Sequence, residues 1–164
     1  MTRRGGSYET TPIQPASRGE NLPGNDRWGG KQVEYLTEDE RQKFRLTVHD
    51  GLLHDSSGHL FDTASARTLW MPSGGRAIFA MDHYGHLYSA PFHILGEFHH
   101  SSFLAGEPVA GAGEIAASQG KVLLISDHST HYRPARKYTR QVIDSLRRQG
   151  VAVADSQIEY HFGE

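Results

Sequence analysis

The sequence predicts an α+β fold that is dominated by antiparallel strands and has a few helices. Short apolar runs recur along the chain between turn residues, as in the stretch from Ala77 to Ser89. Tyr138, Val142 and Leu146 repeat at helical spacing and predict one amphipathic helix. Because the pattern shows no repeat or heptad run, a length of 164 residues suits one domain with its own core.

Residues 1–30 are predicted to be a flexible lead or linker, because glycine and proline recur there among few apolar anchors. A single domain is then expected over residues 31–164. Its first helix is expected to start at Thr37, because Glu40 three residues later completes a capping-box pattern, and to run to about Lys43.

Strands account for most of the remaining elements. Alternation of apolar and polar residues predicts a strand at 44–48. Two hairpins are expected to turn at Asp55–Gly58 and Asp82–Gly85, where glycine allows a positive φ. Further strands are predicted at 94–104, 108–117, 121–126 and 151–161. Between the last two, Pro134 begins the amphipathic helix and Gly150 ends it.

Composition excludes several kinds of chemistry. The chain has no cysteine, which rules out disulfides, a thiolate nucleophile and a cysteine zinc site. The formal net charge of -2 gives no overall attraction to nucleic acid or anionic lipid. No apolar run is long enough to span a bilayer, and no signal-type hydrophobic region starts the sequence. Membrane insertion is therefore not expected.

The stretch FHHSSFLAGEPVAGAGEI, residues 98–115, combines histidines, serines and carboxylates with very small residues that let a ligand approach the backbone. In the strand predicted there, His100 and Ser102 would share one face, and His99, Ser101 and Phe103 the other. Adjacent histidines cannot chelate one metal from a regular strand, so no metal site is expected. One His-Ser pair is expected to bond a ligand in a cleft, and the alternative is that the serines only satisfy backbone groups.

Two glutamates are candidate catalytic acids. Glu114 follows Gly111-Ala112-Gly113, so its carboxylate would stand beside exposed backbone, where it could orient a ribose hydroxyl or stabilise positive charge. Glu159 lies in a Gln-x-Glu spacing near the end of the sequence. A solvated strand glutamate is the alternative interpretation for Glu114.

A polar segment leads into a basic helix. The polar segment is Ser126 to Pro134. The N-terminus of a helix binds anions, and the guanidinium of Arg133 would add a second group that binds phosphate. This pattern indicates a pyrophosphate or nucleic-acid site, and a polar loop that only caps the helix is the alternative.

Residues Gly51 to Pro134 resemble the C-terminal toxic modules of bacterial polymorphic toxins, including those of Rhs type. The resemblance rests on Phe61–Thr63, Ala80–Asp82 with Leu87–Tyr88, Phe98–Gly106 and His131–Pro134. The HSSFLAG and HYRP strings within it also look like those of plant IQ-motif calmodulin-binding proteins. We find no IQ motif in the chain, so their calmodulin role is not expected to carry over.

The toxin modules are similar to ADP-ribosyltransferases, which implies a split antiparallel β core that binds NAD as a co-substrate beside residues 99–106. Either Glu114 or Glu159 would stabilise an oxocarbenium-like transition state, with His100 and Ser102 as further catalytic residues. The implied cofactor-binding residues are Arg76, His99, Ser101, Phe103 and Tyr132. The implied acceptor-binding residues are His131, Arg133, Arg136, Lys137 and Arg140.

The leading hypothesis is therefore a mono-ADP-ribosyltransferase toxin that modifies a protein or RNA. It would be delivered as part of a larger toxin, act in the target-cell cytoplasm and be neutralised by a cognate immunity protein. One alternative is a metal-independent ribonuclease that uses His100 and His131 as an acid–base pair. The other is a non-catalytic binding module.

Overall fold

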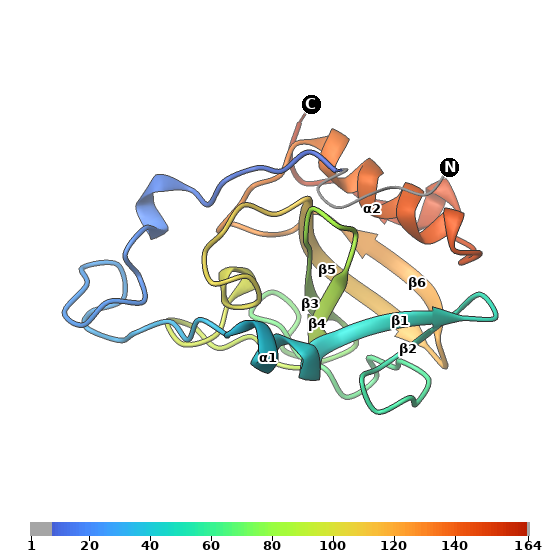
Figure 1. The fold of residues 1–164 in the computed structure, drawn as a ribbon, viewed down its shortest axis with the longest axis horizontal. Coiled ribbons are helices and arrows are strands. Elements are labelled where there is room, and N and C mark those ends of the chain that lie inside the picture. Colours follow the sequence, from blue (N-terminus) through green and yellow to red (C-terminus); the bar gives the residue numbers. More distant parts are fainter. Residues whose placement is uncertain (1–7, 164) are drawn as a thin grey trace.

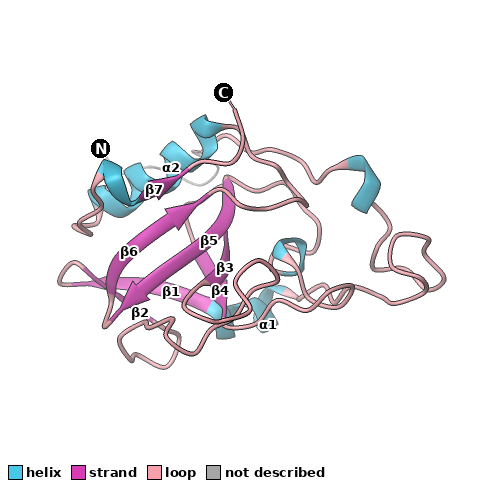
Figure 2. Cartoon of the chain, turned by 180° about the vertical axis from the view of Figure 1, so that it is seen from behind, coloured by secondary structure: helices cyan, strands magenta, loops and turns pink. Residues whose placement is uncertain are grey.

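The computed structural model describes residues 8–163 and contains one curled seven-stranded sheet (Figures 1 and 2). The strand order is β2-β1-β4-β3-β5-β6-β7. The strands are β1 Arg45–His49, β2 Leu52–His54, β3 Ala77–Met81, β4 Leu87–Ala90, β5 Gly111–Ser118, β6 Lys121–Ser126 and β7 Ile158–Glu159. The α-helices are α1 Glu38–Arg41 and α2 Arg136–Arg148, and the 3-10 helices are η1 Pro15–Ser17, η2 Gln42–Phe44, η3 His100–Ser102 and η4 Asp155–Gln157.

The predicted α+β class is confirmed, with a difference in the sheet. All neighbouring strands are antiparallel except β6 and β7, which run parallel, so the sheet is mixed. The strands form one sheet rather than a split core. Across the curled sheet, the Leu53 N–H donates to the Gly120 carbonyl at 2.9 Å, which joins β2 to the turn between β5 and β6.

Helix α2 covers one face of the sheet, as Figure 2 shows. Its buried face carries Val142, Ile143 and Leu146, which pack into a core with Phe79 and Ile115 of the strands. This helix confirms the prediction made from the apolar spacing. Burial of such a stripe against a sheet is the main source of stability for a helix of this length.

A second core lies on the opposite face of the sheet. Ile78 and Tyr88 of the strands pack there with Phe103 and Tyr132. The segment 8–30, expected to be a linker, reaches this region, because Ile13 belongs to the same core. The earlier residues 1–7 lie outside the described part of the chain.

The strand predicted at 94–104 is wrong. The chain forms an isolated bridge between Ile94 and Phe98 and then the 3-10 helix η3. Every residue from 98 to 104 is buried, so the alternation expected of a half-buried strand is absent. β3 is flanked by β4 and β5, which leaves no free edge beside it where this segment could pair.

Other predicted elements are confirmed with shorter bounds. Thr37 and Glu40 form the expected capping box at α1. The hairpin around Asp82–Gly85 joins β3 to β4. The strand predicted at 151–161 is reduced to β7, because Val151 and Val153 instead fill the core against α2 without a ladder.

Gly113 permits the closest backbone approach beside β5. A Cβ built there would collide with the Ser126 carbonyl oxygen, whereas one at Gly111 would meet the Val142 side chain. We therefore expect Gly113→Ala to lower the free energy of unfolding by roughly 3 kcal/mol or more, because backbone cannot yield as a side chain can. Urea unfolding measures this, with Gly111→Ala as the control that costs less. Equal losses for the two variants would contradict this account of the approach.

Candidate functional site

Arg76, Glu114 and Glu159 meet on the face of the sheet opposite α2. Glu114 projects from the middle of β5, Arg76 immediately precedes β3, and Glu159 lies in β7. The Arg76 guanidinium donates to both Glu159 oxygens, at 3.0 and 3.3 Å. Its Nη1 lies 3.8 Å from Glu114 Oε1, within ion-pair range but beyond a hydrogen bond. Three residues expected from the sequence to belong to one site are thus together.

Glu114 is the unusual member of this group. Its side chain is 0% exposed, and neither carboxylate oxygen has a hydrogen-bond partner among the described residues. Burial raises the pKa of Glu114, while Thr68 and Arg76 oppose that rise. Glu159 is the opposite case, because its hydrogen bonds with Arg76 hold its pKa below the ordinary value. A buried carboxylate without a bonding partner costs stability, which marks the position as a candidate site.

Aromatic rings line one side of this carboxylate pair. Trp70 stacks on His128 with ring centroids 3.7 Å apart, and His128 stacks on His161 at 4.2 Å. His161 Nε2 also lies 2.8 Å from Glu159 Oε1. The imidazole of His100 is behind Trp70, at 6.4 Å between centroids, and is fully buried.

A second polar cluster surrounds Glu20. His131 Nε2 lies 2.6 Å from Glu20 Oε1, and the Tyr35 hydroxyl donates to the other oxygen at 2.7 Å. Burial alone would raise the pKa of Glu20, but the hydrogen bond and charge of His131 outweigh it and lower that pKa. His131 stacks on His99 at 4.3 Å, and Trp28 stacks on His99 at 4.8 Å. The cluster fixes the 8–30 segment against the HHSSF region.

The histidines of that region are neutral and enclosed. Burial lowers the pKa of His93 to about 4 and that of His99 to about 3, and it lowers the pKa of His100 well below the ordinary value. His100 Nε2 bonds the Gly113 carbonyl at 2.8 Å. A neutral, enclosed imidazole cannot act with His131 as a solvent-facing acid–base pair, which removes the geometric basis of the ribonuclease alternative.

The tandem serines are sealed in the interior. Ser101 and Ser102 are both 0% exposed, and the Ser102 hydroxyl accepts the His99 N–H at 3.0 Å as a cap of η3. Phe103 and Tyr132 are core residues, and the Tyr132 hydroxyl donates to the Glu107 carbonyl. Side chains placed in this way have no open surface on which a dinucleotide could lie.

The basic residues spread over different contacts. The guanidinium of Arg133 lies over the Phe162 ring at 5.1 Å, and that of Arg136 lies over the Tyr160 ring at 4.6 Å. Lys137 pairs with Glu9 at 3.6 Å, and Arg140 is exposed on α2. They do not converge on one anion at the start of the helix.

Sequence reasoning missed Glu20, Trp28, His93 and Trp70. The first two lie in the segment interpreted as a linker, and nothing local distinguishes them from other polar or aromatic residues there. The high count of 11 histidines was the only available signal, and it did not indicate which of them would meet in space.

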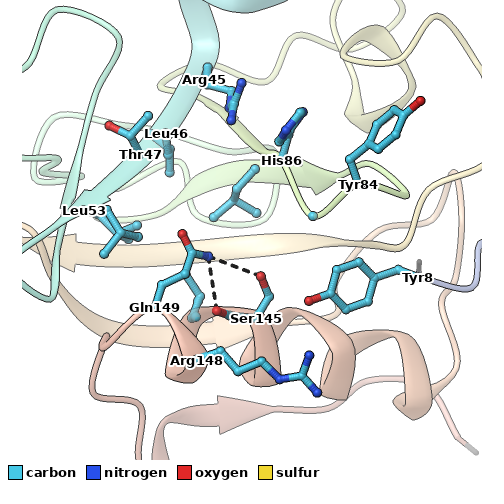
Figure 3. A pocket seen from close by; sticks show the side chains of 14 residues that line it. Tyr8, Arg45, Leu46, Thr47, Leu53, Tyr84, His86, Ser145, Arg148 and Gln149 are labelled. Atoms are coloured by element: carbon cyan, nitrogen blue, oxygen red, sulfur yellow. Dashed lines mark hydrogen bonds between the residues drawn. The ribbon is translucent and has the colours of Figure 1, made fainter. Parts of the chain in front are cut away.

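A groove of about 630 Å³ lies between α2 and strands β1, β2 and β4, away from these clusters (Figure 3). Leu46, Leu53 and Leu87 form an apolar floor there. Polar groups border it, and they come from Tyr8, Arg45, Tyr84, His86, Ser145, Arg148 and Gln149. None of the described lining residues is acidic, and Arg45 Nε has no hydrogen-bond partner within residues 8–163. The groove lacks a nucleophile paired with a base, but its size suits a bound segment.

The described residues 8–163 contain no group of three or more His, Asp or Glu side chains placed to hold a metal ion. None of their helices is both long and apolar enough to cross a bilayer.

Comparison with known proteins assigns the family. Residues 40–139, more than half of the chain, match the family described as the IQ motif-containing protein middle domain. The chain belongs to this family. No solved structure matches the chain, so the predicted likeness to an ADP-ribosyltransferase core is not confirmed.

Relatives come from Arabidopsis thaliana. IQ domain-containing protein IQM3 is 31% identical over 77% of this chain and 26% of its own length. IQM2 is 29% identical over 75% of this chain and 20% of its own length, and IQM5 is 31% identical over 73% and 22%. The chain therefore spans about a quarter or less of the length of these relatives.

The family overturns the toxin hypothesis. These relatives are named as IQ domain-containing plant proteins and not as toxins, so the predicted ADP-ribosyltransferase activity is wrong. The predictions that depended on this activity are wrong as well: an immunity protein, a macromolecular acceptor and delivery into a target cell. The plant IQ-motif side of the resemblance is confirmed. NAD binding stays a prediction, although the enzyme activity for which it was predicted is wrong.

The dipeptide Ile-Gln, in that order, occurs once in the chain, at Ile13–Gln14. Ile13 is buried, and the Gln14 side chain donates to the Tyr132 carbonyl at 3.2 Å. Pro15 then begins η1, which is only three residues long. This pair is therefore part of the folded core and is not displayed on an exposed helix.

Replacement of Glu114 by glutamine tests the cost of its burial. Because the folded state raises this pKa, the native protein binds the proton more tightly, and stability falls as pH rises from about 4.5 through the raised value. We expect Glu114→Gln to be increasingly more stable than the wild type from pH 5 to pH 8 in urea unfolding. A stability difference that does not change with pH would contradict the raised pKa.

Replacement of Glu20 tests the buried pair with His131. Since the folded pKa of Glu20 is lowered, its contribution is present above the ordinary pKa of 4.5 and is lost as pH falls through the lowered value. Glu20→Gln should cost roughly 3 kcal/mol at pH 7 and less at pH 3, as followed by denaturant unfolding. The exposed Glu34→Gln should cost almost nothing, and a similar loss for both variants would argue against a special role for Glu20.

Proposed function

We propose that this chain is a non-catalytic binding module whose groove takes an acidic, amphipathic segment of a partner protein. The observation that carries the proposal is the combination of a leucine floor with a cationic border that has no acidic lining residue. An amphipathic helix buries its apolar face in such a groove and leaves its charged face at the border.

The border is weakly neutralised by nearby acids. Arg148 pairs with Asp144 at 2.9 Å on the surface of α2, and His86 lies 3.3 Å from Asp82. The Arg148–Asp144 pair is solvent-accessible, and such pairs contribute little stability, so a ligand carboxylate can compete for the Arg148 guanidinium. Arg45 adds a second guanidinium to the border of the groove.

The groove also fits binding better than catalysis. Its lining residues include hydroxyl groups from Tyr8, Tyr84 and Ser145, but the Ser145 hydroxyl is bonded by the Gln149 side chain at 3.3 Å rather than by a base. His86 is the one histidine among the described lining residues, and it faces the Asp82 carboxylate at 3.3 Å. Membership of a middle-domain family, found in much longer relatives, is in keeping with a module that holds a partner segment.

A peptide titration tests this function. The probe is a synthetic 14-residue helical peptide with leucine on one face and glutamate on the other, and its control carries lysine in place of glutamate. We expect the acidic peptide to bind, to shift NMR signals of the groove residues and to bind more weakly at high salt. The lysine peptide should not bind.

Variants locate the site. Arg148→Glu should weaken binding of the acidic peptide by about ten-fold, because it replaces attraction at the border by repulsion. Lys121→Glu makes the same charge change at an exposed position of β6, outside the groove, and should leave binding unchanged. Equal weakening by the two variants, or equal binding of the two peptides, would refute a specific acidic-segment site.

A further inference from the structure

The tail segment, defined here as residues 158–163, lies along the outer edge of β6 with few main-chain bonds. Strand β7 pairs with β6 only at Ile125 and Ser126. Beyond β7, the N–H groups of His161 and Phe162 donate to the buried Asp127 carboxylate at 2.7 and 3.2 Å. Attachment of the tail segment therefore depends on a small set of polar contacts rather than on a long ladder.

Side chains of the tail segment supply the remaining contacts. Glu159 receives the bidentate hydrogen bonds of Arg76, a geometry that makes a strong and directional ion pair. The Tyr160 and Phe162 rings lie beneath the guanidinium groups of Arg136 and Arg133. The edge of β6 thus recognises a carboxylate followed by two aromatic rings.

Arg76 has a second carboxylate within reach. Its side chain is 19% exposed, and that of Glu159 is 36% exposed, so water reaches this ion pair. On its inner side Arg76 Nη1 lies 3.8 Å from Glu114, whose two oxygens have no hydrogen-bond partner among the described residues. If Glu159 leaves, a small movement brings Arg76 onto Glu114. An unpaired arginine at a half-buried position would cost stability, and pairing with Glu114 avoids this cost when the tail segment is released.

We infer that the outer edge of β6, with Arg76 and Asp127, is a binding site for an extended peptide of a partner protein, and that the tail segment occupies this site in the closed state. In the open state Arg76 pairs with Glu114. An extended partner segment with the pattern aliphatic-Glu-aromatic-x-aromatic then adds to β6 as a parallel strand. Its glutamate takes the place of Glu159 at Arg76, and its backbone N–H groups bond Asp127. This site lies apart from the groove and does not depend on it.

Binding of a tail peptide in trans tests the site. The probe is a fluorescein-labelled synthetic peptide with the sequence of residues 156–163, SQIEYHFG, added to the full chain and followed by fluorescence anisotropy. Glu159→Gln weakens the resident segment, so the probe should bind this variant about ten-fold more tightly than the wild type. A probe with glutamine in place of its glutamate should lose that binding. Glu97→Gln, which alters an exposed pair with Lys31, serves as the control and should behave as the wild type.

Amide hydrogen exchange tests the role of Arg76 separately. In Glu114→Gln the open state loses its charged partner for Arg76, so the His161 and Phe162 amides should exchange about five-fold more slowly than in the wild type. In Glu159→Gln the same amides should exchange faster. Both variants can be checked for folding by urea unfolding, so a failure to fold cannot be mistaken for an open tail.

Three outcomes would overturn the inference. One is equal probe binding by wild type and Glu159→Gln, or no binding by either. Another is an unchanged exchange rate of the two amides in Glu114→Gln, which would mean that Arg76 does not pair with Glu114 in the open state. The third is dimerisation of the wild type that Glu159→Gln abolishes, measured by light scattering, because the occupant would then be a second copy of this chain rather than a partner protein.

Discussion

The close approach of Gly113 to the Ser126 carbonyl positions most of the polar chemistry of this protein. Without a side chain at Gly113, the backbone of residues 126–127 lies directly against β5, where any Cβ would collide with it. Glu114, the next residue, then faces the opposite side of the sheet beside Arg76, while Asp127 reaches the tail segment. The close approach at Gly113 thus lies between Glu114, which is near Arg76, and Asp127, which bonds the tail segment. The Gly113 carbonyl also bonds His100, which anchors η3 to the same strand.

Much of the fold could be predicted from local patterns. The capping box at Thr37, the β3–β4 hairpin and α2 each depend on residues close in sequence, so short-range rules were sufficient. The strand at 94–104 failed because its apolar and small residues are buried on all sides by tertiary packing, which a local pattern cannot reveal. The long strand predicted at 151–161 was wrong for a related reason. Contacts with Asp127 and Arg76 hold the tail segment in place, rather than the main-chain bonds of a strand ladder.

The candidate site was only partly visible in the sequence. Arg76, Glu114 and Glu159 were expected in one site and do meet, although the role given to them came from a toxin resemblance that the family overturns. The serines and histidines of residues 99–102 looked like site residues because polar groups among small residues suit ligand contact. In the fold they are buried instead: Ser102 bonds the His99 N–H, and His99 stacks on Trp28, which comes from a distant segment. Composition cannot distinguish a buried polar network from an open site, since both need the same residue types.

Glu114 is a buried carboxyl group with no hydrogen-bond partner among the described residues, and it lies beneath an arginine that is bonded to a different acid. A ¹³C NMR titration of the Glu114 side-chain carboxyl tests this most directly. The account predicts a midpoint clearly above the ordinary glutamate value of 4.5, since burial raises this pKa. A midpoint at or below 4.5 would contradict it, because it would mean that Arg76 is already bound to Glu114 and that Glu159 has no special hold on the tail segment.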